Sequence, residues 1–195
     1  MIIVSHRRNT IEELESTPSN LGVEVDIRSQ SDELIIHHDP FSPGVSFAKW
    51  LDSYKHKLLI LNVKEEGLEE RIIQLMAKKE IENYFFLDQS FPFLIKWANK
   101  GERRLAIRVS EYESIETALN LRDKIQWAWI DCFTRFPLSE KNIDSIKSSG
   151  LKLCIVSPEL QGRNADTEVP EMRNQIKALD LKIDAVCTKR VDLWQ

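Results

Sequence analysis

Short apolar runs rich in Val and Ile recur along the whole chain, and this recurrence limits the possible folds more than any other feature. Eight such runs occupy residues 2–6, 22–27, 58–64, 84–88, 105–110, 127–133, 151–157 and 183–188. Most are continuously apolar rather than alternating, which is typical of strands covered on both faces. A shorter run at residues 34–38 directly follows the second. The pattern predicts eight buried strands and one short additional strand.

Segments with helical spacing lie between these runs. Thr10 followed by Glu13 is a capping-box pattern that predicts a short helix. Ser139 begins another predicted helix, and Gly150 stands where a helix C-terminus favours glycine. Pro170 is expected in the first turn of a helix over residues 170–179. The other predicted helices cover residues 47–54, 68–79, 91–99 and 114–124.

The alternation of strand and helix predicts a parallel sheet. Eight strand–helix units that close on themselves form a TIM (β/α)8 barrel, whereas fewer form an open doubly wound sheet. Eight strands favour a compact barrel, although 195 residues is short for that fold, which usually takes about 250. The insertion after the second strand is minimal, and Lys189–Gln195 is too short for a full final helix. No linker is visible, so residues 1–195 are predicted to form one domain.

Composition excludes several classes of protein. The chain is 42% hydrophobic and 30% charged, and its net charge of −4 does not favour a nucleic-acid partner. No apolar run approaches the roughly eighteen residues of a membrane span, and the chain begins almost directly on a strand without an export signal. Cys132, Cys154 and Cys187 lie in or beside apolar runs without metal-site spacing, which predicts buried thiols and a cytoplasmic protein. The oligomeric state is left open.

Polar residues collect where the predicted strands end, which in a TIM barrel is where active sites lie. These residues are His6, Arg7, Glu24, Asp26, Asn62, Lys64, Asp88, Arg108, Asp131, Ser157 and Glu159. Glu24 and Asp26 are two apart on one strand and therefore share a face. Paired carboxylates can hold Mg²⁺ or Ca²⁺, imidazoles can transfer protons, and Lys and Arg can bind an anion. This set predicts phosphate-ester chemistry.

Each of these residues also has a structural interpretation. Glu24 and Asp26 fit the wet face of an amphipathic hairpin, His6 fits a satisfied core histidine, and Lys64 fits a helix-start charge. Arg108 and Asp131 are expected to form an internal ion pair. The tryptophans divide in the same way: Trp127 and Trp129 are expected in the core, and Trp50 or Trp194 near the rim, where one of them contacts substrate.

Three pieces of sequence together resemble the glycerophosphodiester phosphodiesterases. They are His6-Arg7 after the first strand, Glu24-x-Asp26 on the second and His38-Asp39 after the short strand that follows. That family belongs to the TIM-barrel phosphodiesterase superfamily, which also contains the phosphatidylinositol-specific phospholipases C. The segment 184–190 is similar to the family's closing strand. The resemblance spans nearly the whole chain, but it is specific only at His6-Arg7 and within Gly22–Pro40.

The resemblance implies a metal-dependent phosphoric diester hydrolase of lipid metabolism, with a small glycerophosphodiester-like substrate. It implies a divalent cation, Mg²⁺ or Ca²⁺, on Glu24 and Asp26. His6 and His38 would be the general acid and base, and Arg7 and Lys64 would bind the phosphate. His38 is preferred to His37, which alternation sends to the opposite face, because it directly precedes Asp39.

The chain also departs from the family. Arg8 follows His6-Arg7 directly, where the family usually has Gly and a longer loop that carries a Glu. Asn62, two residues before Lys64, stands where the family has its third metal carboxylate and is a weaker, neutral ligand. Glu65, Glu66 and Asp88 are the candidates to compensate for it. The insertion after His38-Asp39 is reduced to residues 41–57, which predicts a more open site. Two alternatives follow: a barrel that binds a phosphorylated ligand without turnover, and diester chemistry without metal, as in the phospholipase C relatives.

Overall fold

The eight predicted long strands are all present, and helices alternate with them. The structure is a computed structural model that describes residues 1–195. The long strands are β1 (Ile2–Ser5), β2 (Gly22–Gln30), β5 (Leu59–Val63), β6 (Tyr84–Leu87), β7 (Ala106–Val109), β8 (Trp127–Ile130), β9 (Lys152–Val156) and β10 (Ala185–Thr188). The helices are α1 (Ile11–Ser16), α2 (Phe47–Asp52), α3 (Glu69–Lys78), α4 (Phe91–Asn99), α5 (Ile115–Asn120), α6 (Glu140–Ser149) and α7 (Ala165–Ala178).

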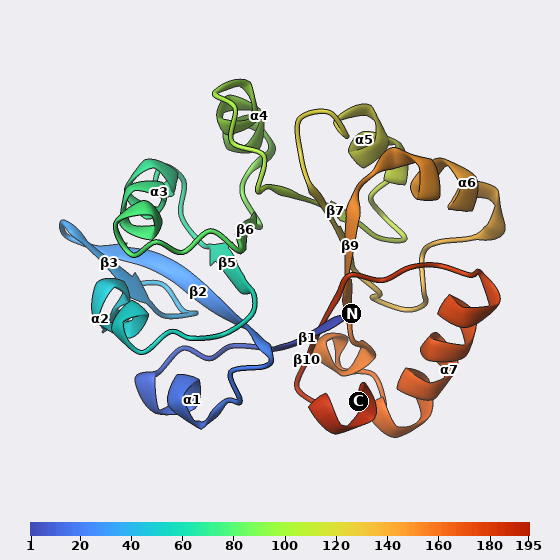
Figure 1. The fold of residues 1–195 in the computed structure, drawn as a ribbon, viewed down its shortest axis with the longest axis horizontal. Helices are drawn as coiled ribbons and strands as arrows, with labels where there is room; N and C mark the ends of the chain where they lie inside the picture. Colours follow the sequence, from blue (N-terminus) through green and yellow to red (C-terminus); the bar gives the residue numbers. More distant parts are fainter.

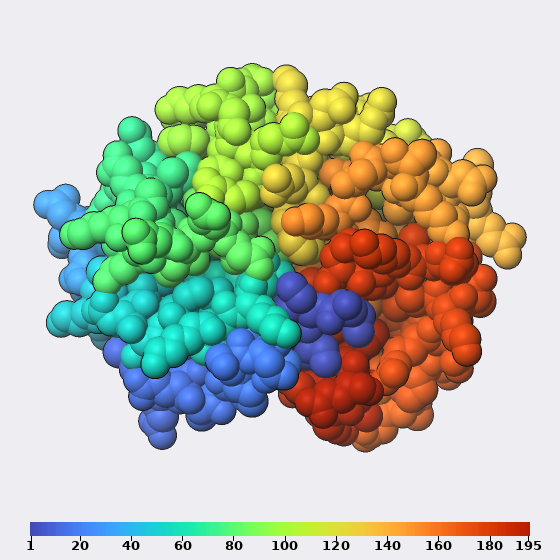
Figure 2. Space-filling view, viewed as in Figure 1, coloured from blue at the N-terminus to red at the C-terminus, as the bar shows by residue number.

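The eight strands are parallel and form one strongly curled sheet. Ladders run without a break in the order β6-β5-β2-β1-β10-β9-β8-β7. The two ends of this series, β6 and β7, meet at a single isolated bridge between Phe86 and Leu105. The helices lie around the outside of the strands (Figure 1). In the space-filling view the first residues (dark blue) lie against the last segment (red), as the pairing of β1 with β10 requires (Figure 2). The architecture is therefore a TIM-like α/β fold.

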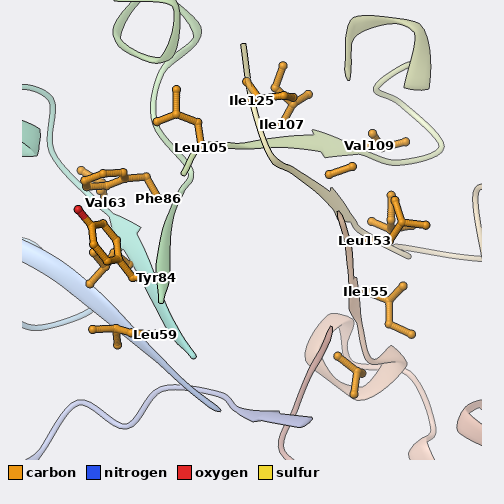
Figure 3. Close-up of a cluster of buried hydrophobic side chains, with 14 of the residues drawn as sticks. Leu59, Val63, Tyr84, Phe86, Leu105, Ile107, Val109, Ile125, Leu153 and Ile155 are labelled. Carbon is orange, nitrogen blue, oxygen red and sulfur yellow. The ribbon is translucent and has the colours of Figure 1, made fainter. Parts of the chain in front are cut away.

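The strands carry two separate apolar cores, because alternate side chains point to opposite faces. The larger core lies between the sheet and the helices, and its strand residues include Leu59, Phe86, Ile107 and Ile155 (Figure 3). The smaller core consists of the alternate strand positions, which face the inside of the curl. Its members are Val4, Leu58, Ile60, Phe85, Leu87, Ala106, Trp127, Trp129, Cys154, Val156, Ala185 and Cys187. All three cysteines are buried free thiols, as predicted.

The insertion after β2 is as short as predicted. β3 (Glu33–Ile36) returns antiparallel to β2, and the two-residue β4 (Val45–Ser46) pairs with β3 before α2 begins. Gly22 lets β2 approach its neighbours closely, since a Cβ at this position would lie 2.9 Å from Val4 Cγ2 and 3.0 Å from the Leu58 carbonyl oxygen. After β10 the chain forms only the 3₁₀ turn η2 (Val191–Leu193).

Most predicted helix ends are confirmed, but two are wrong. Helix α5 ends at Asn120, before the predicted end at Lys124. Thr10 and Glu13 form the reciprocal capping box at α1, and Gly150 ends α6 in the left-handed conformation. Helix α7, however, begins at Ala165, five residues before Pro170. The Asn164 side chain accepts hydrogen bonds from the backbone N–H groups of residues 166 and 167, and this cap starts the helix early. Pro170 therefore lies inside the helix, where it has no N–H group to donate to the carbonyl oxygen one turn earlier.

Two tryptophans predicted to lie near the rim are instead buried. Trp50 is fully buried, and its indole N–H donates to the Arg8 carbonyl oxygen over 2.9 Å. Trp194 donates to Ser157 Oγ over 2.9 Å in a buried contact. Each indole therefore fixes a loop to the body of the protein, and neither is available to a substrate. The helices are all too short or too polar to cross a lipid bilayer.

Candidate active site

Five of the predicted site residues line one pocket inside the C-terminal end of the curled sheet. The pocket has a volume of about 270 Å³, and its walls include His6, Arg7, Glu24, Asn62 and Lys64. The even-numbered positions of β1, β2 and β5 face the inside of the curl, as Val4 and Ile60 show. The same alternation places His6, Glu24, Asn62 and Lys64 above the inner core. The residues predicted from strands β1, β2 and β5 are therefore brought together.

Glu24 is almost completely buried at the base of this pocket. The backbone N–H of Arg7 donates to Glu24 Oε2 over 2.8 Å, and His6 Nε2 lies 3.7 Å from the same oxygen. Burial, reinforced by the negative charge of Asp26, raises the pKa of Glu24 to about 7. The Arg7 N–H, Asn62 and Lys64 partly offset this shift. The carboxyl group is thus poised between its neutral and charged forms near neutral pH.

Asp26 is fully buried beside Glu24 and is held by four contacts. Asn9 Nδ2 donates to Asp26 Oδ2 over 2.8 Å, while the Asp26 backbone N–H donates to Asn9 Oδ1 over 3.1 Å. Lys64 Nζ lies 3.2 Å from Oδ1, and Arg7 Nε lies 3.5 Å from Oδ2. Lys64 is therefore directed at a buried carboxylate and does not serve as a helix-start charge, because α3 begins only at Glu69. Its pairing fixes the Lys64 side chain at the edge of the pocket.

His6 is neutral over the whole physiological pH range. Burial lowers the pKa of His6 to about 3, and the positive charges of Arg7, Lys189 and Lys64 add to this effect, whereas Asp26 opposes it. Its Nδ1 is buried and has no hydrogen-bond partner. A neutral imidazole beside an anion-binding pocket can accept a proton, which is the role of a general base.

Two residues reach the pocket only because their backbones leave the extended conformation. Arg7 has a φ of 50° and Asp88 a φ of 59°. Strand alternation alone would direct both outward, since His6 and Leu87 take the preceding inner positions. The left-handed turn instead presents the Arg7 N–H to Glu24 and the Asp88 carboxylate to Arg108. Such conformations are uncommon for residues other than glycine and cluster at functional sites.

The three predicted metal ligands each have one buried oxygen that accepts no hydrogen bond, although Lys64 Nζ forms an ion pair with one of these oxygens, Asp26 Oδ1, over 3.2 Å. These atoms are Glu24 Oε1, Asp26 Oδ1 and Asn62 Oδ1. Asp26 and Asn62 lie directly opposite each other in the β2–β5 ladder. Unpartnered buried acceptors are costly, and a hard cation that prefers oxygen ligands would satisfy all three. The chain has no group of three or more His, Cys, Asp or Glu side chains that could hold a metal, and Asn62 belongs to none of these residue types. The donor set fits a divalent cation, with one neutral ligand.

None of the residues suggested as a substitute for the third carboxylate joins this group. Glu65 accepts hydrogen bonds from the Ser29 N–H and hydroxyl at 3.1 and 2.6 Å, and Glu66 is exposed. Asp88 forms an ion pair with Arg108. Arg108 Nη1 also lies 2.6 Å from Asp131 Oδ2, so the predicted internal pair is present as part of a three-residue cluster.

Sequence reasoning missed Lys189, which lines the pocket next to His6. Its position continues the inner alternation of β10 after Ala185 and Cys187, and this periodicity is the signal that could have identified it. Glu159 Oε1 accepts hydrogen bonds from the Lys189 N–H over 2.9 Å and from the Thr188 hydroxyl over 2.6 Å. No acidic side chain pairs with the Lys189 ammonium group, which leaves a free positive charge at the pocket.

His38 is the one predicted catalytic residue that does not line the pocket. Its Nδ1 lies 2.7 Å from Asp39 Oδ1, and its side chain is 41% exposed. The His37 backbone N–H donates to the Asp26 carbonyl oxygen over 3.0 Å, which anchors the segment beside the pocket. His38 therefore lies at the same end of the sheet as His6 but is not in contact with the buried carboxylates.

Comparison with known proteins gives similarity at the level of structure. No protein-family model matches the chain, and no curated protein sequence matches it either. A crystal structure of a glycerophosphoryl diester phosphodiesterase from Parabacteroides distasonis is similar, with a TM-score of 0.67 and 14% identity over 98% of this chain and 84% of that one. A glycerophosphodiester phosphodiesterase from Agrobacterium tumefaciens matches with a TM-score of 0.62 and 12% identity, over 100% of this chain and 98% of that one. The chain has the fold of these glycerophosphodiester phosphodiesterase structures over nearly its whole length.

Proposed function

We propose that this chain is a metal-dependent phosphoric diester hydrolase that acts on a glycerophosphodiester-like substrate in a closed (β/α)8 barrel. The observation that carries the proposal is the pocket itself. It is lined by Glu24 and Asn62, each with a buried oxygen that accepts no hydrogen bond, by a neutral imidazole and by the cations Arg7 and Lys64. The buried carboxylate of Asp26 does not line the pocket but lies beside it, 3.2 Å from Lys64 Nζ. Metal binding, proton transfer and charge neutralisation are the three requirements of phosphodiester cleavage.

Glu24, Asp26 and Asn62 would hold a divalent cation, Mg²⁺ or Ca²⁺. When bound, the cation supplies Lewis acidity to a phosphoryl oxygen and lowers the pKa of a nearby hydroxyl. Two charged ligands and one neutral ligand make this a weaker site than three carboxylates would. The Arg7 N–H fixes Glu24 Oε2 and leaves Oε1 for the cation.

The side chains around the pocket would bind the phosphoryl group and transfer protons. Arg7 and Lys64 bind the non-bridging phosphoryl oxygens and stabilise the charge that grows on them in the transition state. His6, neutral at physiological pH, accepts the proton of the attacking hydroxyl, which is a neighbouring alcohol of the substrate or water. His38, oriented by Asp39, donates a proton to the leaving alcohol once substrate draws the segment inward.

The experiment that tests this proposal is a screen of glycerophosphodiesters with Mg²⁺, with Ca²⁺ and with a chelator. We expect turnover that requires a divalent cation and is abolished by His6→Ala. Activity that survives the chelator would support metal-free diester chemistry instead. If no diester is hydrolysed under any of these conditions, the hydrolase proposal is wrong.

A second candidate is a barrel that binds a phosphorylated ligand without turnover. Two observations favour it: Asn62 replaces a carboxylate, and His38 does not line the pocket. Tight binding of a phosphodiester that remains intact after prolonged incubation with metal would identify this function. The conversion of bound diester to a monoester and an alcohol would exclude it.

A further inference from the structure

A larger cavity opens beside the active-site pocket. It has a volume of about 480 Å³ and is lined by Leu87–Gln89, Phe91, Leu94, Ala106–Arg108, Glu113 and Thr117. We call it the side cavity. Its walls come from the ends of β6 and β7, from the first turns of α4 and α5 and from the loop before α5. Figure 1 shows α4 next to β6 and α5 next to β7.

The side cavity exists because β6 and β7 part. Their ladder is a single bridge, between Phe86 and Leu105. All other neighbouring strands in the series share at least two paired residues. After the bridge no ladder pairs Leu87 with β7, and the side cavity lies there, with Leu94 of α4 and Thr117 of α5 in its walls. The close-up shows Phe86 and Leu105 near each other, while Ile107 and Val109 point away along β7 (Figure 3).

The side cavity and the active-site pocket share a wall. Leu87, Asp88 and Arg108 line both spaces. Arg108 is held there by its ion pairs with Asp88 and with Asp131, the latter at 2.6 Å. The two spaces are therefore adjacent, with the Arg108 side chain between them, and a ligand that occupied both would have to pass over it.

The volumes favour a ligand that uses both spaces. Small-molecule sites usually measure about 300–1,000 Å³. The active-site pocket alone, at about 270 Å³, falls just below this range, whereas the side cavity lies within it. A phosphodiester has two alcohol groups, and one of them needs room outside the phosphoryl site.

The lining of the side cavity indicates the chemistry of that alcohol. Half of the lining residues are apolar, and the polar ones include Asp88, Gln89, Glu113 and Thr117. The first three already have partners within the protein, which are Arg108, Glu69 and Ser110. A carboxylate has several acceptor positions, so Asp88 and Glu113 can still accept a further hydrogen bond. An acyl chain would desolvate these polar groups without replacing their hydrogen bonds. A quaternary ammonium group would require a cage of aromatic rings, and Phe91 is the single aromatic residue present. A polyol satisfies the polar groups with its hydroxyls and packs its C–H faces on the apolar ones, including the half-exposed ring of Phe91.

We propose that the side cavity is the subsite for a polyhydroxylated alcohol of the substrate diester, such as a sugar or a cyclitol. This inference rests on the proposed function in that it takes the phosphoryl group to lie in the active-site pocket. It assigns substrate selection to residues of β6, β7, α4 and α5, whereas the proposed catalytic and metal-binding residues come mainly from β1, β2 and β5.

The test is a binding measurement, which does not depend on turnover. Isothermal titration calorimetry with glycerophosphoinositol, diethyl phosphate and inorganic phosphate compares a polyol diester with ligands that lack a polyol. Thr117→Trp narrows the side cavity at an exposed position, and Glu116→Trp, one residue earlier on the same helix, is the matched control. Phe91→Ser is a second variant at an exposed position and removes the ring without filling the cavity.

We expect the unmodified protein to bind glycerophosphoinositol at least roughly tenfold more tightly than diethyl phosphate, the effect of one or two hydrogen bonds. Thr117→Trp should abolish this preference, Phe91→Ser should reduce it, and Glu116→Trp should preserve it. Affinity for inorganic phosphate should not change in any of them. Equal binding of the two diesters by the unmodified protein, or a preference unaffected by both cavity variants, would overturn the subsite. Preferential binding of the polyol diester without its hydrolysis would leave the subsite intact and contradict the hydrolase function.

Discussion

The Arg7 backbone N–H donates to Glu24 Oε2 over 2.8 Å, and this contact exists because Arg7 has a φ of 50°. One residue therefore performs two separate tasks: its backbone fixes a buried carboxylate, and its guanidinium group lies 3.5 Å from Asp26 at the pocket wall. The two tasks can be separated experimentally, because glycine accepts this backbone conformation without strain.

Arg7→Gly should preserve the fold and impair the site. Relief of a left-handed conformation, worth about 1 kcal/mol or more, offsets the loss of the contact with Asp26. We expect the free energy of unfolding in urea to stay within about 1 kcal/mol, while kcat/KM for a diester falls roughly 10- to 100-fold. Arg8→Ala is the control, because Arg8 does not line the pocket. Full activity in Arg7→Gly would show that the guanidinium group does not bind substrate.

Asn62→Asp should strengthen metal binding. The substitution adds a charged oxygen ligand to Glu24 and Asp26, so the dissociation constant for Mg²⁺ or Ca²⁺ should fall roughly tenfold or more. Asn62→Ala removes the ligand and should weaken binding. Calorimetric titration with each metal measures both changes. If the two variants and the unmodified chain bind metal equally, Asn62 is not a ligand.

Substitution of the two histidines should separate their roles. His6→Ala and His38→Ala should each lower kcat by about 10²–10⁴, the usual value of a proton-transfer group. His37→Ala is the control and should retain most of the activity, because its ring Nδ1 is bonded locally to the Asp39 backbone. If His37→Ala lost activity while His38→Ala kept a normal rate, His37 and not His38 would be the proton-transfer residue.

Lys189→Met should weaken phosphate binding and change the titration of His6. Lys189 contributes a free positive charge to the pocket and lowers the pKa of His6. We expect weaker binding of inorganic phosphate with a smaller dependence on salt, and a His6 pKa above its present value of about 3 when followed by NMR. Lys182→Met, at a side chain that is 90% exposed, should change neither quantity. An unaltered His6 titration in Lys189→Met would place the ammonium group away from His6.

The pKa of Glu24 should make stability depend on pH. In the folded chain this carboxyl group keeps its proton up to about pH 7, but in the unfolded chain it loses the proton near its ordinary value of 4.5. Between these values the folded state binds more protons, so the free energy of unfolding contributed by Glu24 falls as pH rises from about 4.5 to 7. Glu24→Gln has no ionisable group at this position, so this pH-dependent fall in the free energy of unfolding should disappear.

We therefore expect Glu24→Gln to be more stable than the unmodified chain at pH 8, by roughly 1–3 kcal/mol, and little different at pH 4. Urea unfolding in the presence of a chelator measures this difference without any contribution from metal. Comparison of the two chains at each pH also cancels the opposite effect of His6, whose lowered pKa costs stability as the pH falls below 6.5. A stability difference that does not change between pH 4 and pH 8 would contradict the raised pKa.

The strands and the alternation of their side chains were largely predictable from the sequence. A continuously apolar run is typical of a strand in a parallel sheet covered on both faces, and all eight predicted runs are strands in the structure. The same periodicity correctly placed Glu24, Asp26, Asn62 and Lys64 on one inner surface. The start of a helix was harder to predict where two residues could each mark it. Both Asn164 and Pro170 suit a helix N-terminus, and the structure begins α7 at the Asn164 cap.

The turns after the strands could not be predicted in the same way. Arg7 and Asp88 enter the pocket because their φ angles are positive, and neither position has the glycine that usually indicates such a conformation. The separation of β6 from β7 depends on how the whole sheet curls, and neither strand's own residues signal it. Trp50 and Trp194 have polar N–H groups that suit a rim position, but both groups find buried acceptors that lie far away in the sequence. Such long-range contacts leave no local pattern.

The isolated bridge between β6 and β7 also determines how the molecule can open. Continuous hydrogen bonding connects β2, β5 and β6 on one side and β7 to β10 on the other, and β1 is the strand that joins the two groups. Between β6 and β7, at the two ends of this series, a single bridge joins Phe86 and Leu105. The contact between these two strands is therefore the weakest in the series. Amide hydrogens along this contact should exchange with solvent sooner than those of the central ladders, because it is where the least free energy is needed to separate neighbouring strands.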